Sequence, residues 1–126
     1  MPVSDTQLTD AFDRGCTDGI ESLSAIDQDF YRIQDFIIEY EMGGLTGYFY
    51  NRLPDIAEIQ LAIAAMKRHG LKQLAKHLQQ ATELFANYVD PNPPTTWNVV
   101  LGQYDPKDQL SKLDKRIGAL DNYGVA

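Results

Sequence analysis

Two histidines and one cysteine are the side chains of this sequence best suited to catalysis or metal binding. His69 and His77 lie eight residues apart across Gly70, so no single helical face presents both to a metal ion. Cys16 has no histidine or asparagine near it in the sequence, and we expect a buried filler rather than a nucleophile. The sequence therefore predicts no enzyme activity, no metal site and no cofactor.

Residues 41–51 read Glu-Met-Gly-Gly-Leu-Thr-Gly-Tyr-Phe-Tyr-Asn and interrupt a strong helical pattern. The glycines invite comparison with a phosphate-binding loop, but the Gly-Lys-Ser/Thr ending is missing and the segment follows a helix rather than a strand. We therefore expect a corner between two helices, because glycine permits sharp turns and close packing. The residues expected to be structural here are Glu41, Gly43, Gly44, Tyr48, Phe49 and Asn51.

Apolar residues recur with helical spacing along most of the chain. Ser4 or Asp5 can cap a first helix, which glycines should break near residues 15–19, and Ser24 can cap a second. An apolar stripe follows at Ile26, Phe30, Ile33, Ile37 and Tyr40, and further stripes run from Ile56 to Met66 and from Leu71 to Tyr88.

The end of the chain is less regular. A proline-rich loop is expected near residues 90–97, and residues 97–101 are compatible with either a strand or a helical turn. Asp55 with Glu58 is typical of a capping box, and Asp108 can cap a last helix through Leu120. The sequence thus predicts one all-α, bundle-like domain over residues 1–126, with about five helices and mostly short loops.

Charge is unevenly distributed along the chain, whose net charge is −7. Residues 1–60 hold 12 Asp/Glu and 3 Arg, whereas residues 61–126 hold 6 Asp/Glu and 8 Lys/Arg. The acidic half would repel nucleic acid and suits a basic protein partner, or simply favours solubility. Asp35 and Glu39 lie roughly opposite the apolar stripe and should be solvated. The acids expected to share one partner-binding surface are Asp10, Asp13, Asp18, Glu21, Asp35 and Glu39.

The first residues show no basic and apolar signal-peptide pattern, and polar residues interrupt the most apolar segment. A single cysteine is compatible with a reducing compartment. We therefore expect a cytoplasmic protein that makes no contact with a membrane.

The motif at residues 41–51 resembles a bacterial domain family of mostly uncharacterised proteins whose best-known member is a DNA-mimic protein. Residues Glu41, Gly43, Gly44, Tyr48, Phe49 and Asn51 match the family pattern. Met42, Leu45 and Gly47 depart from it. The similarity covers about residues 20–90, and a weaker similarity follows around Leu110 to Asp114. The resemblance implies an α-helical fold and, more loosely, DNA mimicry, since that activity belongs to a surface rather than to the glycine motif.

Three hypotheses on function follow. The first is a non-enzymatic acidic domain that binds a basic protein, such as a DNA-binding regulator. The second is an immunity or antitoxin-like inhibitor of a toxin. The third is a small-ligand binder or hydrolase, which predicts a pocket at the corner that contains Glu41, Asn51 or Trp97.

Overall fold

The computed structural model describes residues 3–126, and these residues form helices and no strands. The prediction of an all-α fold is confirmed. Residues 3–126 form six α-helices rather than about five, because residues 97–104 form a helix of their own. No helix within the described residues is long and apolar enough to cross a membrane. The helices are α1 (Asp5–Asp18), α2 (Ala25–Arg52), α3 (Ile56–Arg68), α4 (Lys72–Glu83), α5 (Trp97–Tyr104) and α6 (Gln109–Gly118), with short 3₁₀ turns η1 (Ile20–Ser22) and η2 (Asp121–Gly124).

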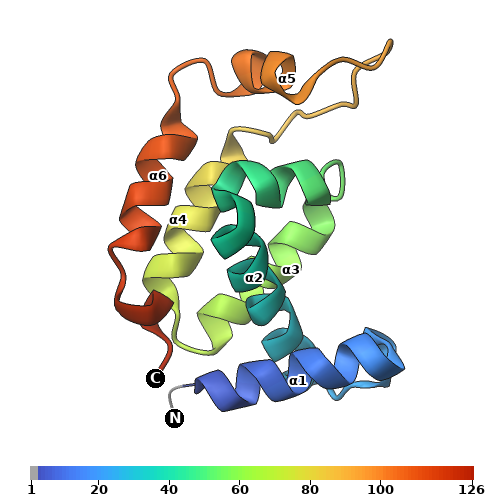
Figure 1. Cartoon of the computed structure of the whole chain (residues 1–126), viewed down its shortest axis with the longest axis vertical. Coiled ribbons are helices and arrows are strands. Elements are labelled where there is room, and N and C mark those ends of the chain that lie inside the picture. Colours follow the sequence, from blue (N-terminus) through green and yellow to red (C-terminus); the bar gives the residue numbers. More distant parts are fainter. Residues whose placement is uncertain (1–2) are drawn as a thin grey trace.

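Helices α2, α3, α4 and α6 pack side by side, and α1 lies across one end of α2 (Figure 1). The predicted stripe on α2 is largely confirmed, since Phe30, Ile33 and Ile37 are buried. Ile26 is an exception at 59% exposed. Phe36, which that stripe omitted, is fully buried.

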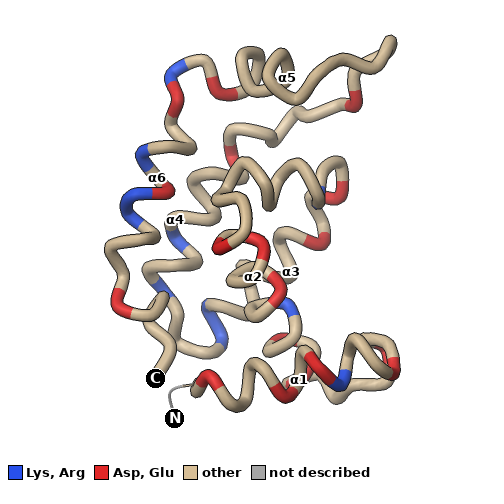
Figure 2. Tube along the Cα trace, in the orientation of Figure 1, with Lys and Arg blue, Asp and Glu red and all other residues tan. Residues whose placement is uncertain are grey.

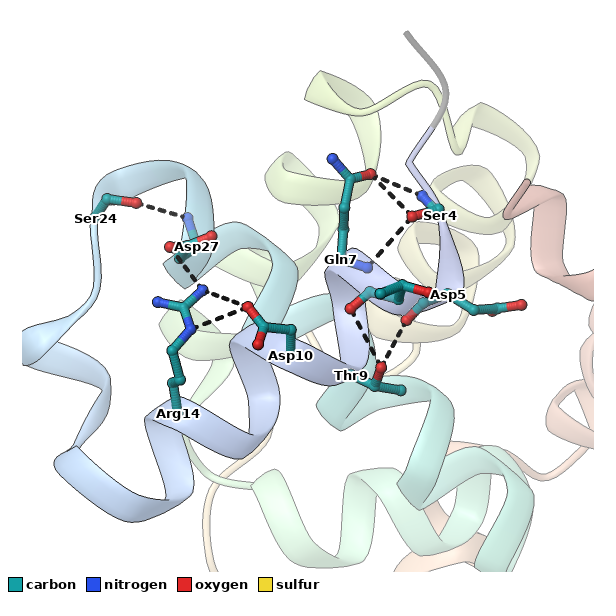
Figure 3. Close-up of polar contacts among 9 residues, drawn as sticks. Ser4, Asp5, Gln7, Thr9, Asp10, Arg14, Ser24 and Asp27 are labelled. Carbon is teal, nitrogen blue, oxygen red and sulfur yellow. Dashed lines mark hydrogen bonds and ion pairs between the residues drawn. The ribbon is translucent and has the colours of Figure 1, made fainter.

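The predicted starts of α1 and α2 are confirmed. The Ser4 hydroxyl accepts a hydrogen bond from the Gln7 backbone, and the Gln7 side chain accepts one from the Ser4 backbone, which completes a capping box (Figure 3). Ser24 accepts a bond from the Asp27 N–H at 3.2 Å. Helix α1 runs through Gly15 and ends before Gly19. A Cβ at Gly15 would lie 2.4 Å from the Tyr31 ring, so glycine lets α1 approach α2 closely.

Two predicted caps differ in the structure. Asp55 does accept the Glu58 N–H at 3.1 Å, but the Glu58 carboxylate binds Arg32 at 2.8 Å instead of completing a box. Asp108 occupies the N-cap position of α6 without capping it, because its backbone is left-handed with φ of 54°. The buried Asp105 caps α6 instead and accepts two backbone N–H bonds at 2.7 and 3.0 Å.

Helix α5 and the segment before it project from one end of the four packed helices (Figure 1). Residues 97–101, for which the sequence is compatible with a strand or a helical turn, are helical and belong to α5. Trp97 is half-buried, with its ring stacked on Phe85 at a centroid distance of 6.2 Å. Tyr50, from the last turn of α2, packs its edge on Trp97 and stays 63% exposed.

Candidate functional site

The glycine corner is a sharp kink within α2, as the sequence predicts. Gly44 has φ of 65° and ψ of −165°, and helical backbone precedes and follows it. Asp114 of α6 accepts the Leu45 N–H at 2.9 Å, so it caps the second half of α2. The Tyr40 hydroxyl donates to the Asp114 carbonyl at 2.7 Å. The positive φ with extended ψ favours glycine at position 44, and a Cβ there would also lie 3.1 Å from the Asp114 carboxylate.

The other residues of the motif support the corner. Tyr48 and Phe49 are fully buried in the core, as predicted, and their rings pack edge to face. The Asn51 side chain donates to the Glu39 carboxylate at 2.6 Å and so links the two halves of α2. Glu41 lies beside Tyr123, where burial first and the Glu41 charge second raise the pKa of Tyr123 to about 12.

Asp35 and Glu39 are not the fully solvated carboxylates that the sequence predicts. Arg52 forms an ion pair with Asp35 and lies 3.9 Å from Glu39. The two acidic side chains are only 24% and 22% exposed. In a straight helix, residues 35 and 52 would be about 25 Å apart along the axis. The kink at Gly44 brings Arg52 back to Asp35 and Glu39, and the Arg52 guanidinium offsets much of the negative charge of these two carboxylates.

The acids of α1 and η1 remain exposed. Asp10 shares Arg14 with Asp27 of α2, at 3.0 Å from each carboxylate (Figure 3). This bridge joins α1 to α2 and confirms that the two acidic helices are adjacent. Among residues 3–126, no Lys, Arg or His forms an ion pair with the acids just beyond the bridge. These unpaired acids are Asp13, Asp18 and Glu21.

A cluster around Asp29 was missed by the sequence analysis. The buried Asp29 carboxylate accepts two bonds from Arg68, at 2.8 and 2.7 Å, and lies 3.0 Å from His69 Nε2. Burial disfavours its charged form, but the bonds from Arg68 and His69 outweigh this effect and lower the pKa of Asp29. Asp29 lies four residues before Ile33, on the buried face of α2, and that spacing could have indicated its role.

The structure also bears on the exposure of Cys16, on metal binding and on a pocket at the glycine corner. Cys16 is exposed, so its prediction as buried filler is wrong. Within residues 3–126, no group of three or more His, Cys, Asp or Glu is placed to hold a metal ion. Three hollows lie between α4 and α6, beside α3 and α4, and at η2. None of these three is lined by Glu41, Asn51 or Trp97, the residues expected around a corner pocket.

Sequence comparison identifies the family of the chain. A sequence model of the DMP19-like protein family matches residues 21–124. The match extends past the expected residues 20–90 into α6, which supplies the Asp114 cap of the corner. No curated protein and no solved structure matches the chain. Because the family model covers most of its length, the chain belongs to the DMP19-like protein family.

Proposed function

We propose that this chain is a non-enzymatic interaction domain whose acidic α1–η1 surface binds a basic protein in place of DNA. The α1–η1 surface consists of Asp10, Asp13, Asp18 and Glu21. The observation that carries the proposal is the exposure of these four acids, among which residues 3–126 supply an ion-pair partner only for Asp10, namely Arg14. Many of the Lys and Arg residues lie across the molecule on α4 and α6 (Figure 2).

The spacing of these acids suits a DNA-binding groove. Along one strand of duplex DNA, successive phosphates are separated by about 3.4 Å of helix axis, so one or two phosphate steps span about 3.4–7 Å. On α1, the helical rise separates Asp10 from Asp13 by about 4.5 Å and Asp13 from Asp18 by about 7.5 Å along the axis. A groove that binds successive phosphates could therefore meet several of these carboxylates at once.

The α1–η1 surface is also held rigidly, which reduces the entropy lost on binding. The capping box at Ser4 fixes the start of α1, and Arg14 ties its middle to Asp27. Asp35 and Glu39 belong to the structural pair with Arg52, so we assign them a minor part in binding. Membership of the DMP19-like protein family is compatible with this role. The family resemblance described above implies DNA mimicry loosely, and the acidic surface is what would carry that activity.

An inhibitor of a toxin is the second candidate, and the exposed apolar side chains near α5 favour it. Tyr50, Val89 and Val99 are all more than half exposed and would suit a partly apolar interface. Such binding would resist salt, whereas binding through the α1–η1 surface should weaken steeply as salt rises.

The test is capture from a cell extract of the source organism at low salt, followed by elution with a duplex DNA oligonucleotide. The wild type should capture a DNA-binding protein that the duplex displaces. The triple variant Asp13→Asn/Asp18→Asn/Glu21→Gln should lose this capture. A control variant with the same charge change, Asp90→Asn/Asp108→Asn/Asp121→Asn, should keep it. The proposal would be refuted if duplex DNA did not displace the captured protein and the variant Asp13→Asn/Asp18→Asn/Glu21→Gln captured as much of it as the wild type.

A further inference from the structure

A stripe of polar residues runs along the outer face of α4. Lys72, Lys76, Gln79 and Glu83 follow one another at spacings of four, three and four residues, and Gln80 lies next to Gln79. Leu74, Ala75 and Leu78 on the other face are buried. Helix α6 packs beside α4. It contributes a parallel stripe in which Lys112 and Arg116 lie one turn apart.

Two adjoining hollows follow these stripes. The first, of about 450 Å³, lies between the end of α4 and α6, and Leu84 and Leu113 supply its apolar lining. The second, of about 580 Å³, extends along α4 toward Lys67 of α3. Gln80 and Glu83 line both hollows, so the two form one continuous groove. We call it the basic groove, after its six cations Lys67, Lys72, Lys76, Lys107, Lys112 and Arg116.

The cations of the basic groove are not used to hold the fold together. Within residues 3–126, ion pairs involve the three arginines of the first half, Arg68 and His69, and none involves a cation of the groove. Glu83 is the one acid among the residues that line the two hollows. Figure 2 shows blue segments along α4 and α6, away from α1, where most of the charged segments are red. The groove therefore presents six cations against one carboxylate, and Leu84 and Leu113 give it an apolar lining at the end between α4 and α6.

We propose that the basic groove binds an acidic peptide segment of a second protein partner. From Lys72 to Glu83 the groove follows α4 for about 16 Å. An extended peptide rises about 3.3 Å per residue, so about five residues would fill that length. Their carboxylates would meet the lysine and arginine head groups, and an apolar side chain between them would contact Leu84 and Leu113.

The charge pattern favours a peptide over nucleic acid. Over about 16 Å, a DNA duplex would bring about nine phosphate charges against six cations and Glu83. A peptide can place an uncharged residue opposite Glu83, which a phosphate backbone cannot do. The net charge of −7 would also repel a long polyanion beyond the edges of the groove.

The basic groove lies on different helices from the α1–η1 surface, so each can be tested while the other stays intact. The protein would then bridge a basic partner on α1 and an acidic partner on α4 and α6. Failure of the groove experiment would leave the proposed binding of a basic protein untouched, and the reverse also holds.

The experiment measures fluorescence anisotropy of a labelled, end-capped heptapeptide, Glu-Glu-Leu-Glu-Glu-Leu-Glu, at low salt. The wild type should bind it, and binding should weaken as salt rises. Lys112→Gln should weaken binding about three-fold. The matched control Lys115→Gln removes the same charge from the same helix outside the groove and should leave binding unchanged. Lys76→Gln/Lys112→Gln/Arg116→Gln should weaken it about tenfold or more.

Three results would overturn the proposal. The first is a failure of the groove to bind the peptide specifically. It would appear as absence of peptide binding at low salt, or as equal losses of peptide affinity in Lys112→Gln and Lys115→Gln. The second is binding of a duplex DNA oligonucleotide as tight as that of the peptide, which would assign the groove to nucleic acid. The third is self-association in sedimentation that both the groove variant and Asp13→Asn/Asp18→Asn/Glu21→Gln abolish, since that would make a second copy the occupant. Circular dichroism of each variant shows whether it has folded.

Discussion

The neighbouring glycines Gly43 and Gly44 should respond to alanine with opposite changes in stability. Gly44 has positive φ and extended ψ, a backbone conformation that is essentially restricted to glycine. Gly43 has ordinary helical backbone, and apart from its chain neighbours and the adjacent backbone of its own helix, no atom lies within 4 Å of the place where its Cβ would be. The two substitutions add the same methyl group one residue apart, so each is the control for the other.

The expected magnitudes follow from these environments. Alanine at Gly44 must adopt a strained backbone, which costs about 1–3 kcal/mol. Its Cβ would also crowd the Asp114 carboxylate at 3.1 Å and disturb the cap on Leu45. Alanine at Gly43 reduces the backbone entropy of the unfolded chain and stabilises the helix by about 0.5–1 kcal/mol.

Urea unfolding followed by circular dichroism measures both effects. With a urea dependence of about 2 kcal/mol per molar, Gly44→Ala should lower the midpoint by about 0.5–1.5 M. Gly43→Ala should raise it by about 0.3–0.5 M. A midpoint for Gly44→Ala equal to or above that of Gly43→Ala would show that the corner does not depend on the glycine conformation.

Three further predictions concern the charged groups of the fold. Asp114→Ala should cost about 0.5–2 kcal/mol in urea unfolding because it removes a helix cap, while Asp114→Asn keeps the acceptor. Burial raises the pKa of Asp114, so the wild type should gain stability relative to Asp114→Asn as pH falls through that raised pKa. Asp29 has a lowered pKa, so the advantage of wild type over Asp29→Asn in thermal unfolding should be constant above about pH 5 and shrink at lower pH. Arg52→Ala leaves Asp35 and Glu39 without their cation and should lower the free energy of unfolding by about 1–2 kcal/mol, an effect that salt reduces.

Features set by neighbouring residues could be predicted from the sequence. Ser4 and Ser24 cap their helices because the bonds they accept come from backbone groups three residues away. The corner at Gly44 was predictable for the same reason, since glycines interrupt a periodic apolar pattern. Cys16 was placed wrongly, because the buried face of α1 runs through Leu8, Ala11 and Gly15, whereas the sequence predicts a break in the helix near Gly15.

Features that depend on distant residues could not be predicted in this way. Asp114 caps a residue 69 positions earlier in the chain, and nothing near residue 114 indicates that role. Arg52 reaches Asp35 only because the chain turns at Gly44, so a helical wheel drawn through α2 assigns Asp35 to solvent. The same limit applies to the basic groove, whose cations come from three helices and a loop.

The charge of a segment is therefore a poor measure of the charge that a partner meets. The first half of the chain carries a net −9, but Arg52 and Arg68 hold Asp35, Glu39 and Asp29 within the fold. What remains for a basic partner is concentrated where α1 ends and η1 follows. The second half of the chain carries a net charge of only +2, but the six cations of the basic groove form no ion pair with an acid of residues 3–126. A partner at the groove therefore meets more positive charge than the net charge of this half indicates. The α1–η1 surface and the basic groove are thus defined by the charges that remain unpaired in the folded chain. The charge-matched variants test whether those unpaired charges bind a partner.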